Sequence, residues 1–357
     1  MTAPPNPAIA GDAPPAFDLI HAPILRHFPE VVTALGGDPA ALLAGHGLSP
    51  DQCDLANTVT CRQWIAVMEA AATALSVSDF GLRLAERQGG VGLYGQLGGA
   101  MRNARSFGDA LRYVAGHNAA HSLAARVWMG RTASGNHVFM GHDLLVAGVP
   151  GRAQAIEQVL LGGHLGARFL TADQVGARRV HFRHRALSEP ALYRRRFGCE
   201  VRFCQNEDGI AFDAAALECP IVDADEAAFR HIADAIERRH GRDRPPFHAV
   251  VRGVVMQRLG TGSCSNSDVG EALGMHPRTL LRRLREEGTT FQRIKDEVRL
   301  DLMGYYLRET DLEFSVISEK LGFNEQSVLS RFARAQTGAS PSELRAGRNG
   351  PAVITPA

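Results

Sequence analysis

The chain has 357 residues, of which 45% are hydrophobic and 22% are charged. Its length suggests two domains or more, and its apolar content is ample for buried cores. The formal net charge of +1 excludes a protein that is polycationic throughout, so any binding to a polyanion must depend on the local placement of arginines.

The first 16 residues are rich in Pro and Ala and lack both a basic start and a long apolar core. We therefore expect a disordered tail over residues 1–16, not a signal peptide. No stretch of the chain approaches about 20 uncharged apolar residues, so no membrane span is expected. The expected location is the cytoplasm.

Residues 17–125 are predicted to be mostly helical. Apolar residues recur at helical spacing from Trp64 to Leu75 and again from Phe107 to Ala120. A glycine-rich run that begins at Gly89 interrupts the pattern between them. We therefore expect amphipathic helices on both sides of a loop.

Short β-like segments follow, from Ala124 to Met129 and from His137 to Met140, with a Ser-Gly-Asn turn between them. This arrangement predicts a hairpin. A long helix is expected from Gln154 to Phe169, and further strands are expected at Arg179–Arg183 and Ile210–Phe212. The combination indicates a mixed α/β domain.

An apolar stripe lies in the segment from Asp225 to His240. It consists of Phe229, Ile232, Ala233 and Ile236, at the spacing of one helix face. Such a stripe either packs on its own domain or pairs with its twin in a homodimer. The sequence favours neither alternative.

A charged run that ends in two prolines, residues 238–246, has the composition of a linker. The domain boundary is therefore expected near residue 245. One domain would occupy residues 17–237, and a second domain would occupy residues 247–346, followed by a tail over 347–357.

Two versions of one phrase occur in the second domain. Leu-Gly-Met-His-Pro-Arg-Thr-Leu-Leu-Arg-Arg-Leu begins at Leu273, and Leu-Gly-Phe-Asn-Glu-Gln-Ser-Val-Leu-Ser-Arg-Phe begins at Leu321. Each version predicts a helix, a tight glycine turn and a second helix. Two such repeats are typical of paired helix-turn-helix units. We place the units at about 266–287 and 315–336. The offset between the copies grows from 48 at the glycines to 49 further on, so the second recognition helix is predicted to start one residue later.

The second helix of each unit divides into an apolar and a polar face. In the first, Leu280, Leu281 and Leu284 share one arc, and the opposite side carries Arg278, Thr279, Arg282, Arg283 and Arg285. In the second, Val328, Leu329 and Phe332 share an arc, and the remainder carries Gln326, Ser327, Ser330, Arg331 and Arg334. One Arg-rich face is more often a solvated surface, but two matching copies favour DNA binding. Pro277 suits the first turn of its helix, and Asn324 is a candidate cap for the other.

The segment from Phe291 to Arg308 has apolar residues at helical spacing and no Pro, so one helix is expected. It would span roughly 27 Å at about 1.5 Å per residue, close to the ~34 Å turn of B-DNA. A rigid spacer of that length would place both recognition helices on one side of the duplex.

Residues 247–345 resemble the DNA-binding domain of the AraC/XylS family of bacterial transcription regulators. The resemblance rests on the two phrases above, on Glu-Gly-Thr-Thr-Phe after the first and on Thr-Gly-Ala-Ser-Pro-Ser-Glu-Leu-Arg after the second. This sequence departs from the family pattern in the second unit. Leu329 and Ala333 stand where the family usually has Phe, and Ser318 replaces the usual Ala.

The resemblance implies base-edge contacts from Arg278 and Arg282 in the first unit and from Gln326, Ser327 and Arg331 in the second. The chemistry agrees, because Arg pairs bidentately with guanine and Gln with adenine. Arg283 and Arg285 are expected to contact phosphates. Leu281 is expected to pack, although many relatives have a polar contact residue there.

The N-terminal region resembles the arabinose-binding-type domain found in one branch of the same family. The resemblance is carried by residues 79–86, 106–113, 180–184, 193–203 and 215–220. It implies a sensory and oligomerisation domain. It does not establish arabinose, or any sugar, as the ligand.

The sequence gives only weak indications of metal binding or redox chemistry, and none of catalysis. His117 and His121, four residues apart, could share a metal, but nothing nearby completes a ligand set and ordinary packing is favoured. Cys199 and Cys204 are the only close pair among six cysteines, and buried thiols are favoured over a redox switch. No phosphate loop or zinc-protease motif occurs, so no catalysis, cofactor or metal is expected.

We therefore expect an α+β sensor domain followed by an all-α domain with two helix-turn-helix units joined by a linker helix. The expected function is effector-responsive regulation of transcription, with double-stranded promoter DNA, an unknown small-molecule effector and RNA polymerase as partners. Activation is the family expectation. The alternatives are a purely dimerising N-terminal domain or, less favoured, an enzyme fused to a DNA-binding module.

Overall fold

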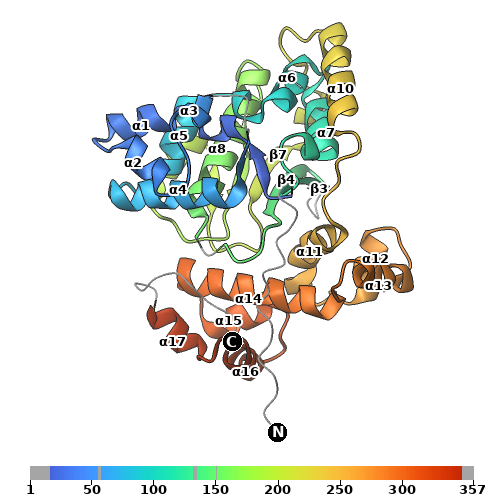
Figure 1. The fold of residues 1–357 in the computed structure, drawn as a ribbon. Helices are drawn as coiled ribbons and strands as arrows, with labels where there is room; N and C mark the ends of the chain where they lie inside the picture. The colour runs from blue at the N-terminus through green and yellow to red at the C-terminus, as the bar shows by residue number, and fades with distance from the viewer. Residues whose placement is uncertain (1–16, 55–57, 132–134, 150, 348–357) are drawn as a thin grey trace.

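The computed structural model describes residues 17–54, 58–131, 135–149 and 151–347. The tail predicted over residues 1–16 and residues 348–357 of the other predicted tail lie outside this range. In Figure 1 an α/β N-terminal region is stacked on an all-helical C-terminal region. This confirms the predicted fold class.

A five-stranded sheet forms the base of the N-terminal region, in the order β3-β4-β7-β5-β6. Only β5 and β6 are parallel among its pairs. The strands are β3 (Ala125–Arg131), β4 (His137–Leu144), β5 (Arg179–His181), β6 (Glu200–Arg202) and β7 (Gly209–Asp213). The predicted hairpin is confirmed as β3 and β4, with Met129 opposite Met140. A separate two-stranded sheet pairs β1 (Leu19–His21) with β2 (Thr58–Thr60).

Helix α8 (Ala153–Leu170), which confirms the predicted long helix, is the centre of this region. It packs on α4 (Cys61–Ala74), α5 (Phe80–Gln88) and strand β7. A Cβ on Gly81 of α5 would lie 2.0 Å from the carbonyl oxygen of Gln154. Glycine at position 81 therefore allows the two helices to approach closely.

The remaining N-terminal helices surround α8 and the sheet. Helix α7 confirms the helix predicted after residue 107, and the single turn η3 continues it to Ala120. The helices that surround α8 are α1 (Phe28–Ala34), α2 (Pro39–Ala44), α3 (Asp51–Asp54), α6 (Gln96–Asn103), α7 (Phe107–His117) and α9 (Pro190–Phe197). The short 3₁₀ turns of this region are η1 (Ala22–Leu25), η2 (Gly92–Tyr94), η3 (Asn118–Ala120) and η4 (Ala214–Glu218).

Helix α10 (Glu226–His240) carries the apolar stripe whose partner the sequence left open. Ile236 is buried with Leu97 and Ala100 of α6, and Phe229 and Ile232 pack against the same cluster. The stripe is thus covered by its own domain. The helix also includes residues 238–240 of the predicted linker, because Arg238, Arg239 and His240 complement the dipole at its C-terminal end.

The C-terminal region is a helical domain built around α14 (Phe291–Glu309), which confirms the predicted spacer helix. Its buried residues include Ile294, Val298 and Leu302, which join a core supplied by the surrounding helices. These are α11 (Phe247–Arg258), α12 (Asn266–Ala272), α13 (Pro277–Glu286), α15 (Phe314–Lys320), α16 (Gln326–Thr337) and α17 (Pro341–Ala346), together with the turn η5 (Leu259–Thr261). Among the helices of the described ranges, none has the length and apolar character needed to cross a membrane.

Candidate DNA-binding interface

The first helix-turn-helix unit consists of α12 and α13. Ser265 and Asp268 form a capping box at the start of α12, and the turn after it is made by Gly274, whose φ is 63°. Pro277 occupies the first turn of α13, as predicted, and Nδ1 of His276 accepts a hydrogen bond from the Arg278 amide at 3.2 Å. Local sequence therefore fixes both ends of this turn.

Helix α13 presents its predicted polar face to solvent. Leu280 and Leu284 are fully buried, and Leu281 packs against the same core, which agrees with the packing role expected for it. The exposed residues of the predicted contact set are Arg278, Arg282, Arg283 and Arg285, and Thr279 is half-buried.

Two of these arginines have partners that the sequence analysis did not consider. Arg282 forms an ion pair with Glu286 at 2.6 Å, one helical turn further on. The guanidinium of Arg283 lies 3.9 Å from the ring centroid of Phe247, at the start of α11. Both side chains are exposed, so both arrangements are open to exchange with a polyanion.

The second unit consists of α15 and α16, joined through Gly322 with a φ of 64°. Helix α13 starts at 277 and α16 at 326, an offset of 49 against 48 between the turn glycines, which confirms the predicted later start. The predicted cap is wrong. Glu325, not Asn324, precedes α16, and no side chain caps the helix.

The turn before α16 is contacted instead by the buried residue Ser318 of α15. Its hydroxyl donates a hydrogen bond to the carbonyl oxygen of Glu325 at 2.9 Å. Ser318 therefore has a structural role at the position where the family usually has Ala. Leu329 and Ala333 are fully buried, and Phe332 packs on Phe323 with ring centroids 5.3 Å apart.

The polar face of α16 is more varied than that of α13. The exposed residues of the predicted set are Gln326, Ser327, Arg331 and Arg334, and Ser330 is half-buried. The Ser327 hydroxyl donates a hydrogen bond to the carboxylate of Glu325 at 3.0 Å. An acidic side chain thus stands beside the expected base-contacting residues of this helix.

Helix α14 fixes the position of each unit through a cation that the sequence analysis missed. The Lys295 ammonium donates a hydrogen bond to the carbonyl oxygen of Cys264, just before α12, at 2.7 Å. The Arg299 guanidinium donates to the carbonyl oxygens of Leu321 and Gly322, both at 3.1 Å. It also lies 4.3 Å from the ring centroid of Phe323. The spacer therefore anchors the first unit just before α12 and the second unit at its turn.

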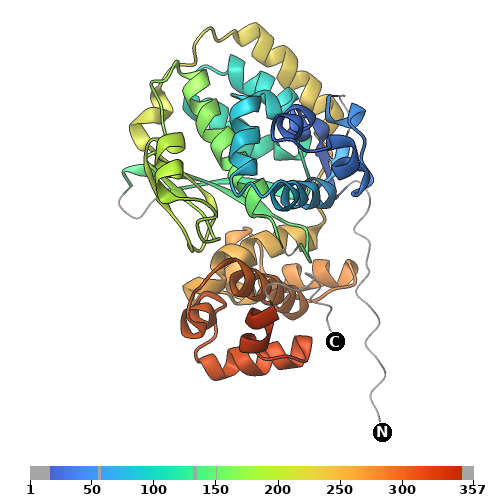
Figure 2. The same cartoon turned by 90° about the vertical axis from the view of Figure 1, so that its left-hand side faces the viewer.

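The opposite side of α14 contacts the N-terminal region, and both views place the helices coloured orange to red directly beneath it (Figures 1 and 2). The Gly148 amide donates to the Asp301 carboxylate at 3.1 Å, and the Arg152 guanidinium lies 4.4 Å from the ring centroid of Tyr305. The Arg185 amide donates to the carbonyl oxygen of Glu309 at 2.9 Å. Contacts to the N-terminal region thus run along the C-terminal half of the spacer.

Two further contacts lie on either side of α14. Arg126 of β3 donates to the carbonyl oxygen of Gly253 in α11 at 3.0 Å and pairs with Asp143 at 2.8 Å. Lys320, at the end of α15, donates a hydrogen bond to the side-chain carbonyl of Asn206. The second helix-turn-helix unit is therefore touched directly by the N-terminal region.

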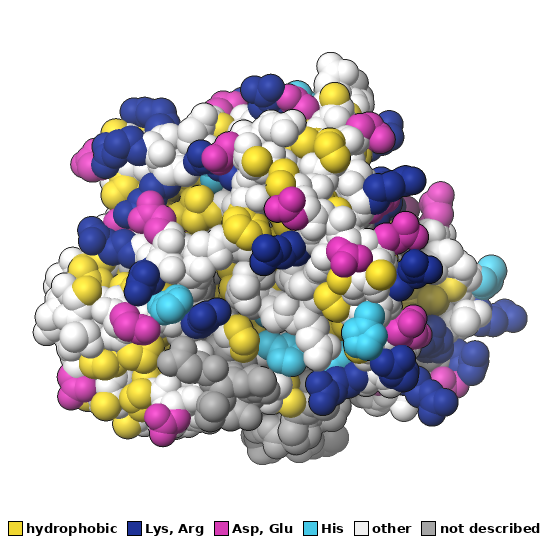
Figure 3. Space-filling view, turned by 90° about the horizontal axis from the view of Figure 1, so that it is seen from above, with side chains coloured by type: hydrophobic (Ala, Val, Ile, Leu, Met, Phe, Trp, Pro, Cys, Tyr) yellow, Lys and Arg dark blue, Asp and Glu magenta, His cyan; other side chains and the backbone are white. Residues whose placement is uncertain are grey.

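The charge distribution elsewhere differs from that of α13. Seen from above, the face of the N-terminal region farthest from the helix-turn-helix units has basic and acidic side chains interspersed (Figure 3). Such a mixed surface offers a polyanion no continuous positive field.

The structure places the two histidines considered as a metal site, and the cysteines considered as a redox pair, as follows. His117 ends α7, and its ring stacks on that of Tyr113 with centroids 4.0 Å apart. His121 follows the next turn, and its ring centroid lies 6.2 Å from that of His21. The two histidines therefore do not share a helix face. All six cysteines lie in the described ranges, and no disulfide joins any two of them. In the part of the chain that the structure describes, no group of three His, Cys, Asp or Glu is arranged to hold a metal.

Comparison with known proteins gives two matches to family models. Residues 36–221 match the model described as the arabinose-binding domain of AraC transcription regulator, and residues 269–347 match a helix-turn-helix domain. The HTH-type transcriptional regulator VirS of Mycobacterium tuberculosis is 31% identical over 329 residues, which cover 92% of this chain and 96% of VirS.

Two further similarities are partial or distant. The transcriptional activator NphR of Rhodococcus sp is 36% identical over 95 residues, which cover 27% of this chain and 28% of NphR. The crystal structure of the transcriptional regulator CdpR from Pseudomonas aeruginosa aligns with a TM-score of 0.40 and 21% identity, over 89% of this chain and 97% of that one.

Proposed function

Because this chain belongs to the AraC family of helix-turn-helix transcription regulators, we propose that it binds promoter DNA sequence-specifically and activates transcription in response to a small molecule. The observation that carries the proposal is the pair of exposed polar faces on α13 and α16, held by one spacer helix. Two recognition helices fixed in this way can enter successive major-groove faces of one duplex.

The two helices have different roles in this proposal. Arg278 and Arg282 contact guanine edges from α13, while Arg283 and Arg285 contact phosphates. Gln326, Ser327 and Arg331 contact base edges from α16, with Thr279, Ser330 and Arg334 at the margins. The site bound by one chain is therefore asymmetric, with a guanine-rich part under α13 and a mixed part under α16.

Effector response is supported by how the N-terminal region contacts the spacer. Arg152, Gly148 and Arg185 contact the helix that sets the separation of the two recognition helices. A ligand that binds one arrangement of these contacts more tightly shifts the population of DNA-binding geometries. Activation is supported by similarity to NphR, which is named as a transcriptional activator. Contact with RNA polymerase is the route to activation in this proposal.

Selection of binding sites from random duplexes with the full chain tests the proposal, and mapping of bound sites on bacterial DNA extends it to genes. We expect enrichment of a motif with two unequal parts, whose centres lie about one helical turn apart. A selection that returns no enriched sequence would overturn the proposal. Sedimentation of the same preparation tests whether the active species is a homodimer.

A further inference from the structure

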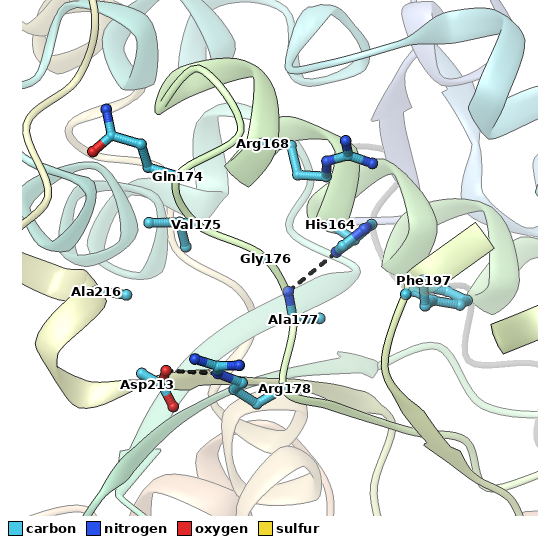
Figure 4. Close-up of a pocket in the computed structure, with 11 residues that line it drawn as sticks. His164, Arg168, Gln174, Val175, Gly176, Ala177, Arg178, Phe197, Asp213 and Ala216 are labelled. Atoms are coloured by element: carbon cyan, nitrogen blue, oxygen red, sulfur yellow. Dashed lines mark hydrogen bonds and ion pairs between the residues drawn. The ribbon is translucent and has the colours of Figure 1, made fainter. Parts of the chain in front are cut away.

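A pocket with a volume of about 310 Å³ opens in the N-terminal region beside the C-terminal end of α8 (Figure 4). The loop that leads from α8 to β5 forms one wall. The end of α9 and the end of β7 form the others. The lining residues are His164, Arg168, Gln174, Val175, Gly176, Ala177, Arg178, Phe197, Gly198, Asp213 and Ala216.

The inner part of the pocket is buried and mostly apolar. Val175, Ala177 and Phe197 are each at most 7% exposed. His164 lies with them, and its Nδ1 accepts a hydrogen bond from the Ala177 amide at 3.2 Å. Burial is the main reason that the pKa of His164 is lowered to about 4. The ring is therefore neutral at pH 7 and carries its proton on Nε2, which makes it a hydrogen-bond donor.

The outer part of the pocket carries two arginines. Arg168 donates its Nε–H to Asp173 at 2.7 Å, and Arg178 donates its Nε–H to Asp213 at 2.6 Å. Both side chains are about half exposed or more, and within the described ranges their terminal amino groups have no hydrogen-bond partner. Each guanidinium is thus paired through its Nε–H with one carboxylate, while its terminal N–H groups remain available as donors beside the pocket.

We propose that this pocket binds a small organic carboxylate, and that this ligand is the effector. The inference rests on the proposed effector response. A guanidinium group presents parallel N–H donors that match a carboxylate. The apolar inner wall suits a short aliphatic or aromatic body, and the volume suits a small molecule. An organic cation would find one carboxylate among the lining residues, Asp213, and that carboxylate is already paired with Arg178.

Two of the segments that line the pocket, helix α8 and the loop that leads into β5, also lead to contacts with the C-terminal helical domain. Helix α8 carries His164 and Arg168 at one end, and Arg152, which precedes its first turn, lies over Tyr305 of α14. Arg152 and Arg168 are about 24 Å apart along the helix axis, because each residue of a helix rises ~1.5 Å. Arg178 leads through β5 to Arg185, which contacts α14. A shift of either element on ligand binding reaches the spacer helix.

The test measures binding of butyrate, hexanoate, benzoate and phenylacetate to the full chain, by calorimetry and thermal unfolding. The primary amide of each acid serves as its neutral counterpart. We expect at least one acid to raise the Tm and bind at least tenfold more tightly than its amide. If no acid binds, or if acid and amide bind equally, the inference is overturned.

Two variants locate the binding site. Arg178→Gln is expected to weaken binding of the acid at least tenfold. Arg179→Gln is the matched control, because Arg179 is the next residue, pairs with Glu200 at 2.8 Å and does not line the pocket. Equal affinity in the two variants contradicts the assigned site. If Arg178→Gln does not fold, Ala216→Leu, which narrows the pocket from its wall, takes its place with the same expected loss.

Binding to the selected DNA, measured with and without the acid, separates this inference from the proposed function. Sequence-specific DNA binding without binding of any acid refutes only the ligand. Binding of an acid without sequence-specific DNA binding refutes the proposed function and leaves the pocket assignment standing. An acid that binds in the pocket without changing DNA affinity refutes its role as effector.

Discussion

The two helix-turn-helix units share one plan but are stabilised differently. In the first, local capping by Ser265 and His276 fixes the helices, and the recognition face is dominated by arginine. In the second, α16 begins without a side-chain cap, and the turn before it is held by Ser318 of α15 and by Arg299 of α14. Both units are anchored to α14, but only the first has a side-chain cap at the start of each of its helices.

This difference has a consequence for regulation. The N-terminal region contacts the second unit through Lys320 and the spacer through Tyr305. A unit whose helices begin without side-chain caps is more open to adjustment than one whose helices are both capped. We therefore expect the effector to act mainly on the half of the DNA site that α16 contacts.

The largest effect is expected at the turn glycines. A Cβ on Gly322 would lie 2.4 Å from the carbonyl oxygen of Leu259, whereas a Cβ on Gly274 would meet nothing within 4 Å. Both have positive φ, so Gly274→Ala should cost about 1 kcal/mol and Gly322→Ala about 3 kcal/mol, because only the latter adds a clash. Urea unfolding of both variants measures the difference. Equal losses would show that the second turn is no more constrained than the first.

The next effect concerns base recognition by α13. Arg282→Ala should lower affinity for the selected DNA by about 1–3 kcal/mol and relax one base position, because a bidentate contact to guanine is lost. Since Arg282 also pairs with Glu286, Glu286→Gln is the control and should leave the preferred base unchanged. Binding-site selection with each variant gives the answer. An unchanged motif and an unchanged affinity in Arg282→Ala would show that Arg282 does not contact a base.

A smaller effect is expected for Ser318→Ala, which restores the residue usual in the family. Loss of the hydrogen bond to the Glu325 carbonyl oxygen should reduce the free energy of unfolding by about 1 kcal/mol. Contacts of α16 with DNA should weaken more than contacts of α13, and footprinting resolves the two halves of the site. Uniform weakening of both halves would contradict the separate anchoring of the second unit.

The smallest effect is expected for Arg285→Ala. Loss of one phosphate contact should weaken binding to all duplexes similarly and reduce the salt slope of log K by about 1. Arg283→Ala should reduce the slope by a similar amount and also weaken packing on Phe247. Titrations at several salt concentrations measure both slopes. Unaltered slopes in both variants would contradict the division between base and phosphate contacts.

The sequence alone determined the features that repeat at short range. The glycine turns, the buried leucines of α13, the length of α14 and the later start of α16 all follow from helical periodicity and from residues with special backbone preferences. These patterns are readable because the interacting residues lie within a few positions of one another. The hairpin of β3 and β4 was predictable for the same reason.

Only the tertiary structure decided how these pieces are held together. Lys295 and Arg299 bind backbone carbonyl oxygens, which every residue has and no sequence pattern marks. The same applies to the covering of the α10 stripe by α6, and to the pocket formed by the ends of α8, α9 and β7. Each depends on which distant segments meet. Periodicity determines the faces of a helix, but only packing determines what each face contacts.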